Sequence, residues 1–352
     1  MLKLKDKELI IQRKLLAWYK KNKRILPWRR LYKNHLPNPY FVMISEYMLQ
    51  QTTVSTVKNR FKEFILNWPS INELATISES RILQYWSGLG YYSRARNLLK
   101  AVKIIKKKFK GKIPNNYDDL IVLPGIGDYT AKAILGIAFN KPVMPIDTNI
   151  ERILSRLYGF QSPLNKIKSE LQNKSYAFIS KKFSSNLIQA FMDYGSLICT
   201  PRKPDCIKCI LKKSCISYKK NIQNFIPIKK ETKIKKIKKY SRAYIFFNEK
   251  SEILVRKRTS KGMLASMLEV PNDNWVINKK KLVQDNIILK FKNKMQSKGF
   301  VEYSFSHFNL ETEVFFTEVK KKIFSDYKWI KKNNLNKSGL PTVMKKIVKI
   351  AL

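Results

Sequence analysis

A glutamate in the segment SEYMLQQT, residues 45–52, stands where a helix would bury it. If this segment is helical, the neighbours of Glu46 three or four positions away are Val42, Met43 and Leu49, which are all apolar. Such surroundings disfavour the charged form of a carboxyl and raise its pKa. A carboxyl that stays protonated near neutral pH can donate a proton to a leaving group. The alternative is a structural acid that only bonds a neighbouring helix.

A second acid, Asp147, directly precedes the segment TNIERIL, which has helical apolar spacing. An aspartate in that place is usually a helix N-cap. However, Thr148 and Glu151 match a T-x-x-E capping box, so we predict that the helix start is satisfied without Asp147. We expect Asp147 to be solvated, ionised and free for chemistry. Two carboxyls in unlike environments can take two roles, one as an acid and one as an anion.

Four cysteines fall within seventeen residues, in a C-x6-C-x2-C-x5-C run made by Cys199, Cys206, Cys209 and Cys215. Disulfides are the alternative, but a strongly basic chain without any other cysteine is a poor setting for them. Four thiolates on one loop favour a metal. A tetrahedral zinc and a four-thiolate iron-sulfur cluster both fit this ligand set, and the spacing does not choose between them.

The segment VLPGIGDYTAKAIL, residues 122–135, sets Gly125 and Gly127 around Ile126 between two helical patterns. Glycines there let the backbone approach a partner closely. The helix that follows would aim free N–H groups and the positive end of its dipole outward, which suits a phosphate. The alternative is a tight turn between two helices that binds nothing.

The composition indicates what kind of partner these groups meet. The 352 residues carry a formal charge of +46, and 44% of them are hydrophobic, so the chain can fold as two or three units and bind a polyanion. Nucleic acid is favoured over a membrane surface because no apolar run could span a bilayer and charges interrupt the N-terminal segment. We therefore predict a cytoplasmic, nucleoid-associated protein, although codon drift toward lysine is an alternative source of part of the charge.

The spacing of apolar residues divides the chain into a helical part and an α+β part. Residues 1–220 show helical steps of three and four, whereas residues 241–352 contain alternating β-branched and aromatic runs. The runs RAYIFFN and EILVRKR are expected strands joined by a hairpin turn at NEKS, and VEYSFSHF and ETEVFFTEV are two more. Residues 221–240 are rich in lysine and are interpreted as a basic linker, either solvated or tracking phosphates.

Six segments together carry a family resemblance. LPWR (26–29), SEYMLQQT, GLGYYSRARNL (88–98), LPGIGDYTA (123–131), IDTNIERIL (146–154) and the cysteine run resemble MutY-type adenine DNA glycosylases of the helix-hairpin-helix (endonuclease III) superfamily. The resemblance implies a mainly α catalytic region, with a hairpin module at about 30–140 and a cluster module at 1–29 plus 141–220. It also implies a [4Fe-4S] cluster on the four cysteines and a Nudix-like domain at 241–352.

The activity implied by the resemblance is excision of adenine mispaired with 8-oxoguanine or guanine in double-stranded DNA, by a monomer. Glu46 would protonate the departing adenine and then activate water, and Asp147 would stabilise the oxocarbenium-like sugar. Tyr129 would line the same site. Related enzymes that also cut the backbone use a lysine at the position aligned with Tyr129, and a tyrosine cannot form a Schiff base. A glycosylase without lyase activity is therefore expected.

Base extrusion and lesion reading are assigned to other residues by the same resemblance. In GLGYY, Leu89 and Tyr91 would form an apolar wedge in the stack, although the flanking glycines could simply end a helix. Gln51 matches the family residue at the lesion face. In FSHF, Ser306 and His307 would read the oxidised guanine; a structural histidine is the alternative.

The C-terminal part departs from the family pattern. Asn309 stands where a second histidine is usual, and KGMLASMLEVP (261–271) replaces a segment rich in glycine and tryptophan. An R-E-x-x-E-E cluster does not follow Gly262, so hydrolysis of nucleotide diphosphates is not expected. Two other functions stay open: a related glycosylase for another base such as thymine or uracil, and a non-catalytic DNA-binding module.

Overall fold

The computed structural model describes residues 2–228, 236–259, 262–285, 287–288, 291, 295–320 and 326–352, without the side chains of 2–5, 336 and 337. The chain divides into two compact units. The first unit is Met1–Thr76 with Asn97–Thr232, and the second is Ile77–Arg96 with Lys233–Leu352. Among the described residues, no helix combines the length and the apolar character needed to cross a membrane.

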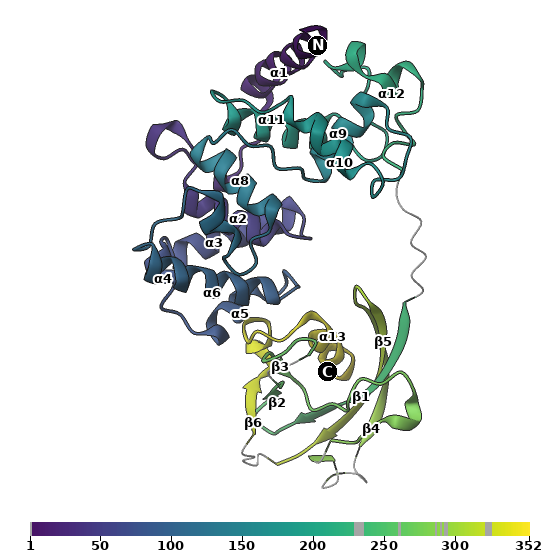
Figure 1. Cartoon of the computed structure of the whole chain (residues 1–352). Helices are drawn as coiled ribbons and strands as arrows, with labels where there is room; N and C mark the ends of the chain where they lie inside the picture. The colour runs from purple at the N-terminus through teal and green to yellow at the C-terminus, as the bar shows by residue number, and fades with distance from the viewer. Residues whose placement is uncertain are drawn as a thin grey trace. The chain divides into compact units, whose positions relative to one another are not determined.

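The first unit is helical, as predicted (Figure 1). α11 packs against α1, α8 and α9, and α2 packs against α3 and α8. The helix α6, Ser93–Lys108, crosses from the second unit into the first. The other helices of the first unit are α1 Leu2–Asn22, α2 Pro39–Leu49, α3 Val54–Asn67, α4 Ile71–Leu74, α7 Tyr117–Ile121, α8 Asp128–Phe139, α9 Thr148–Tyr158, α10 Lys168–Tyr176, α11 Ser184–Leu197 and α12 Ile216–Lys219.

The long helical pattern that contains Glu46 is interrupted after α2. Gln51 has a left-handed backbone with φ +57°, and Thr53 caps α3 by accepting a hydrogen bond from the Thr56 N–H. The apolar period continues across this break, so the period alone does not reveal it. Because α2 ends at Leu49, Gln51 lies on a turn and not on the helix that carries Glu46.

The second unit contains a six-stranded sheet in the order β3-β2-β1-β5-β4, with β6 also paired to β2. β1 and β5 are parallel, and the other pairs are antiparallel. α13 packs on β4, β5 and β1, and its apolar face completes the core. The elements are α5 Glu79–Trp86, β1 Ile237–Phe247, β2 Glu252–Lys257, β3 Leu268–Glu269, β4 Gln296–Ser304, β5 Phe308–Glu318, β6 Tyr327–Lys331 and α13 Thr342–Ala351.

The predicted α+β class of the C-terminal part is confirmed, with several differences in detail. The turn at 248–251 joins β1 to β2, and the Asn248 side chain accepts from the Lys250 and Glu252 N–H groups. β1 begins at Ile237, so the predicted linker extends too far, because pairing with β5 orders its lysine-rich start. Residues 229–235 of that linker lie outside the described residues. β3 and β6 were not predicted.

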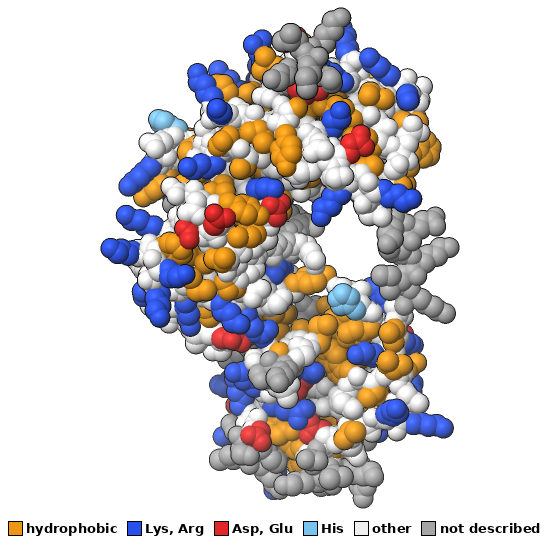
Figure 2. All heavy atoms as spheres, viewed as in Figure 1, with side chains coloured by type: hydrophobic (Ala, Val, Ile, Leu, Met, Phe, Trp, Pro, Cys, Tyr) orange, Lys and Arg blue, Asp and Glu red, His pale blue; other side chains and the backbone are white. Residues whose placement is uncertain are grey.

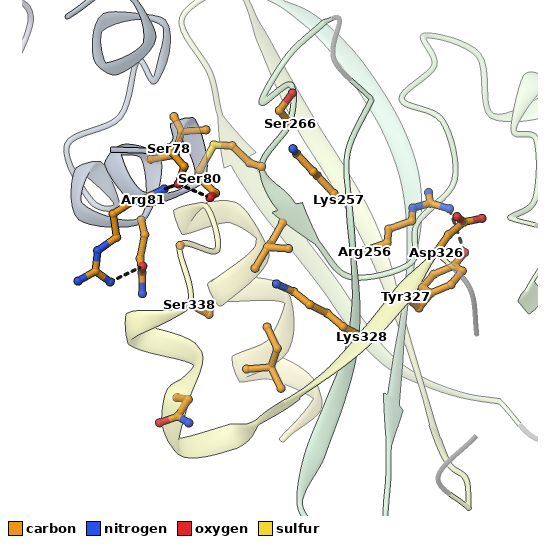
Figure 3. A pocket seen from close by; sticks show the side chains of 17 residues that line it. Ser78, Ser80, Arg81, Arg256, Lys257, Ser266, Asp326, Tyr327, Lys328 and Ser338 are labelled. Carbon is orange, nitrogen blue, oxygen red and sulfur yellow. Dashed lines mark hydrogen bonds between the residues drawn. The ribbon is translucent and has the colours of Figure 1, made fainter. Parts of the chain in front are cut away.

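The segment Ile77–Arg96 groups with the C-terminal part, although the sequence placed it in the hairpin module. The Ser87 hydroxyl donates to the Leu340 carbonyl at 3.3 Å and accepts from Lys345 Nζ at 3.3 Å. A cavity of about 780 Å³ lies in this unit, and Lys257 and Lys328 extend into it from paired strands (Figure 3). None of the predicted site residues lines this cavity.

Candidate active site

A cavity of about 1010 Å³ in the first unit brings the two predicted carboxyls together. Glu46 from α2, Tyr129 from α8 and Asp147 from the start of α9 all line it, and Gln51 lines it from the turn after α2. The convergence follows from the packing, because α2 contacts α8 while α11 contacts both α8 and α9. Residues separated by up to about a hundred positions in the sequence therefore share one space.

Glu46 is buried on α2, with 7% of its surface exposed. Burial raises the pKa of Glu46 to about 7, and repulsion from Asp147 also raises it, whereas a hydrogen bond with Tyr129 lowers it. This is the direction that the apolar neighbours predict, since Val42 and Met43 are themselves almost fully buried. The carboxyl is therefore available in its protonated form near neutral pH.

Tyr129 interacts electrostatically with both acids, Glu46 and Asp147. Burial, followed by the charges of Glu46 and Asp147, raises the pKa of its hydroxyl well above the ordinary value. The hydroxyl therefore stays protonated and is a hydrogen-bond partner of Glu46. A neutral donor at this point can serve the carboxyl and a bound nucleoside in turn.

The expected capping box at the start of α9 is wrong. Asp147 itself is the N-cap, because its backbone is extended (φ −88°, ψ 176°) and the helix starts at Thr148. Its Oδ1 accepts from the Ile150 N–H at 2.7 Å, and its Oδ2 accepts from Asn149 Nδ2 at 2.7 Å. Both oxygens therefore already hold hydrogen bonds, so Asp147 is not free in the sense that the sequence suggested.

The predicted solvation of Asp147 is also incomplete. Burial raises the pKa of Asp147 above its usual value, and the N–H donors of Ile150 and Asn149 and the charge of Arg152 oppose that rise. Donors aimed at a carboxylate favour its charged form. The contrast between the two acids thus comes from hydrogen bonding: Asp147 is surrounded by donors, whereas Glu46 lies among apolar side chains.

Two residues that the sequence reasoning missed connect Asp147 to the cysteine loop. Arg152 donates from Nη2 to Asn149 Oδ1 at 2.9 Å and from Nε to the Cys199 carbonyl at 2.7 Å. Asn149 in turn donates to Asp147. Asn149 and Arg152 lie one turn apart on α9, but only the tertiary fold shows that the loop carbonyl ends this chain of bonds.

Gln189 on α11 is another residue that was missed. It lines the cavity with 3% of its surface exposed, and its Nε2 donates to the Ser185 carbonyl at 3.1 Å. Its Oε1 is buried without a hydrogen-bond partner in the described part of the chain. A buried unpaired acceptor costs about 1–3 kcal/mol, so a ligand that brings an N–H donor would be favoured there. The sequence signal was an amide, Gln189, within the apolar period of residues 184–198, which also contains Asn186.

Two arginines also line the cavity, and both form ion pairs with the same acid, Asp193. Arg24 Nε lies 2.6 Å from Asp193 Oδ1, and Arg29 Nη1 lies 2.6 Å from Asp193 Oδ2. The Asp193 side chain is fully buried, and its pKa is lowered because the hydrogen bonds and charges of both arginines outweigh its desolvation. The cavity thus combines an acid with a raised pKa, a second carboxyl that holds hydrogen bonds and two oriented cations.

The four cysteines lie close enough to influence one another. Burial, followed by repulsion from the other three thiols, raises the pKa of Cys206 to about 11. Among the described residues, no three side chains are arranged to hold a single metal ion. The donor set nevertheless fits a cluster, because like-charged thiolates in one loop need a cation and Arg156 Nη1 already lies 3.3 Å from Cys199 Sγ.

The glycine hairpin is closely packed within the chain at Gly125 and open at Gly127. Gly125 has φ +83°, and a Cβ there would lie 2.8 Å from Tyr47 Cε1, so only glycine fits. Gly127 begins α8, is exposed, and would have open space around a Cβ. The N–H groups at this helix start can face an anion. Figure 2 shows Lys and Arg spread over the visible face of each unit, so charge alone does not locate the DNA.

The predicted wedge separates into one exposed and one buried residue. Tyr91 is 47% exposed with φ +44°, whereas Leu89 is only 5% exposed and does not present a free apolar surface. Ser306 and His307 are exposed in the turn between β4 and β5. Within the second unit, the Tyr91 hydroxyl lies 2.6 Å from Ser306 Oγ.

The raised pKa of Glu46 makes a prediction about stability. A carboxyl whose pKa rises from 4.5 to about 7 on folding contributes most below pH 4.5 and loses that contribution as pH rises through 7. Glu46→Gln is therefore expected to match the wild type at pH 4.5 and to be more stable at pH 8, by up to about 3 kcal/mol. Urea unfolding at both pH values checks this, and a pH-independent difference would contradict it.

Comparisons with known proteins identify the family of the chain. Residues 44–177 match the HhH-GPD superfamily base excision DNA repair protein model, and residues 242–349 match a NUDIX domain. An adenine DNA glycosylase of Buchnera aphidicola subsp. Baizongia pistaciae is 37% identical, over 97% of this chain and 96% of that protein.

Two solved structures share the fold of the helical part. A thermostable thymine-DNA glycosylase is 26% identical with a TM-score of 0.55, over 61% of this chain and 98% of that one. An endonuclease III–DNA covalent intermediate is 22% identical with a TM-score of 0.52, over 62% of this chain and 98% of that one. The near-complete match to the Buchnera protein shows the family: the chain belongs to the adenine DNA glycosylases, base excision repair enzymes with a helical glycosylase region and a Nudix-like domain.

Proposed function

We propose that this protein hydrolyses the N-glycosidic bond of adenine mispaired with 8-oxoguanine or guanine in double-stranded DNA, as a monomer and without cutting the backbone. The observation that carries the proposal is the shared cavity of Glu46, Tyr129 and Asp147, in which burial raises the pKa of Glu46 to about 7. Adenine is a poor leaving group as an anion, so its departure requires a proton. Glu46, with its pKa raised to about 7, can hold a proton near neutral pH and give it up to the leaving base.

Adenine enters the cavity after leaving the base stack. Gln189 offers its unpaired Oε1 to an exocyclic amine, and Arg24 and Arg29 offer donors fixed by Asp193. Glu46 then protonates a ring nitrogen, and the bond to the sugar breaks. Tyr129 keeps its hydroxyl proton throughout and steadies the Glu46 carboxyl by a hydrogen bond.

Loss of the base leaves a sugar with oxocarbenium character, which needs a nearby anion. Asp147 supplies that charge, because the Ile150 and Asn149 donors hold its two oxygens in place. Glu46, now deprotonated, accepts a proton from the attacking water. A Schiff base does not form, since Tyr129 occupies the hairpin helix and Lys132 is paired with Asp128 at 2.8 Å and does not line the cavity.

The duplex is held by further groups, of which Gln51 also lines this cavity. The hairpin from Gly125 to Gly127 binds a phosphate through backbone N–H groups, and Gln51 lies at the base opposite the adenine. Tyr91 enters the stack, and Ser306 and His307 contact the edge of the opposite guanine. The surplus of basic residues implies that affinity falls steeply with salt.

The cysteine loop is proposed to hold a [4Fe-4S] cluster through Cys199, Cys206, Cys209 and Cys215. Such a cluster supplies the positive charge that neutralises the thiolates and closes the loop. The chain's own residues complete the site, since Tyr194 donates to Cys209 Sγ at 3.1 Å and Arg156 binds the Thr200 carbonyl at 2.7 Å. The closed loop in turn supports Arg152 and, through Asn149, Asp147.

One experiment tests the proposal and its alternatives. Single-turnover release is measured on matched duplexes with adenine opposite 8-oxoguanine, guanine or thymine, and with thymine opposite guanine, together with binding. Release of adenine opposite 8-oxoguanine and guanine, but not opposite thymine, is the expected result. Thymine release would instead indicate a glycosylase of the kind seen in the thermostable structure, and binding without any release would indicate a non-catalytic module.

A further inference from the structure

A buried arginine lies directly after the turn that exposes Tyr91. Arg94, the second residue of α6, is only 6% exposed, and burial lowers the pKa of its guanidinium to about 10. It therefore remains charged at neutral pH. A buried charge is costly unless hydrogen bonds compensate it, so the partners of Arg94 show what it stabilises.

Those partners are consecutive backbone carbonyls of one turn. Arg94 Nη2 donates to the Leu89 carbonyl at 2.8 Å and to the Gly90 carbonyl at 3.1 Å, and Nε donates to the Tyr91 carbonyl at 3.4 Å. The guanidinium also lies over the Trp86 ring at 5.6 Å and over the Tyr91 ring at 5.7 Å. The Arg94 guanidinium thus bonds the carbonyls of Leu89, Gly90 and Tyr91 and also lies over the Tyr91 ring.

The turn needs such support because its backbone is unusual. Gly88, Gly90 and Tyr91 have φ of +95°, +68° and +44°. Glycine accepts this region readily, but for a tyrosine it costs on the order of 1–2 kcal/mol and persists only where the surroundings enforce it. Without support, Tyr91 would relax toward negative φ, and its ring would point elsewhere.

We propose that Arg94 is the positioning residue that presents Tyr91 to the duplex. The inference rests on the proposed function, in which Tyr91 enters the base stack, and it assigns the orientation of that tyrosine to a side chain that does not itself contact DNA. The planar guanidinium has donors in a fixed fork, so binding three carbonyls fixes the peptide planes between them. A lysine keeps the charge but has no such fork.

The competing explanation is that Arg94 only stabilises the junction of α5 and α6. A double-mutant cycle separates the two, because it measures whether two side chains act through one another. The variants are Arg94→Lys, Tyr91→Ala and the combination, with Arg81→Lys as the matched control. Arg81 is an exposed arginine on α5 that bonds Gln84 and Tyr85 of the same helix.

We expect Arg94→Lys to lower single-turnover adenine release from an adenine–guanine duplex by about tenfold, and to add nothing once Tyr91→Ala is present. Arg81→Lys should leave the rate unchanged. On a duplex in which the adenine is a single-base bulge and already partly unstacked, the loss caused by Arg94→Lys should shrink to less than about threefold. Unfolding curves show whether each variant is folded.

Rates that multiply in the double variant, or an equal loss on the bulged substrate, would overturn the role of Arg94. If Arg94→Lys does not fold, Arg94→Gln, which keeps two donors and loses the charge, is taken through the same cycle with the same criterion. The outcome is distinct from failure of the proposed function, since a wild type that releases no adenine from any duplex rejects the glycosylase itself.

Discussion

The substitution Glu46→Gln is expected to lower the single-turnover rate of adenine release by at least about a thousandfold, and to change duplex affinity by less than about threefold. Glutamine keeps the size of the side chain and can still bond Tyr129, but it cannot donate a proton to a leaving base. In the proposed function the duplex is bound by the hairpin and by basic residues elsewhere, so binding is not expected to depend on this carboxyl. Release kinetics and a binding titration on the same duplex measure both quantities.

Glu8→Gln is the matched control, because Glu8 is also a buried glutamate, with 4% of its surface exposed, but lies on α1 and accepts from Tyr158 at 2.8 Å. It should remain active. The wild-type rate should also fall as pH rises above about 7, because the acid must be protonated. Equal loss in both variants, or loss of binding in Glu46→Gln, would assign Glu46 a structural role instead.

The burial and raised pKa of Glu46 were predictable because they depend on local spacing. Neighbours three and four positions away are fixed by the helix itself, so apolar side chains there already imply burial and a raised pKa. The partners of Asp147 were not predictable in the same way. A shift of one residue in the helix start turned a supposedly free acid into the N-cap.

The residues that were missed share a dependence on tertiary contacts. Gln189 lies within an apolar helical period, and only the packing of α11 against α8 and α9 shows that it lines the cavity and that its buried Oε1 has no hydrogen-bond partner in the described part of the chain. From the sequence, Arg152 is an ordinary basic residue on a helix, and only the structure shows that it donates to the Cys199 carbonyl. Local patterns therefore predict which element a residue is on, whereas its partners depend on how the elements pack.

The same limit explains the differences in the second unit. The strand expected at 311–319 corresponds closely to β5, whereas the strand expected at 301–308 was placed too late, because β4 ends at Ser304 and leaves Ser306 and His307 in a turn. β3 has two residues and is a strand only because it pairs with Arg256 and Lys257 of β2. The lysine-rich start of β1 has no strand pattern of its own and is ordered by its parallel pairing with β5. Such strands form because they pair with neighbouring strands, and their own sequence pattern does not predict them.

The variant Asp147→Asn is expected to lower adenine release by at least about a hundredfold, with little change in stability. Asparagine is as good an N-cap as aspartate, so the bond from the Ile150 N–H can be kept while the negative charge is lost. A charge aimed at a developing cation in a water-poor site is worth about 3–4 kcal/mol, which corresponds to this loss of rate. Single-turnover kinetics and thermal unfolding of the same preparation measure the two effects.

Comparing Asp147→Ala with Asp147→Asn separates capping from charge, because alanine removes both and asparagine removes only the charge. Loss of the cap should destabilise this variant by about 1 kcal/mol, whereas its rate of release should be close to that of Asp147→Asn. If the two variants lose rate equally and only Asp147→Ala loses stability, the charge and not the cap serves catalysis. A near-normal rate in Asp147→Asn together with a slow Asp147→Ala would instead mean that Asp147 acts by holding the start of α9 in place.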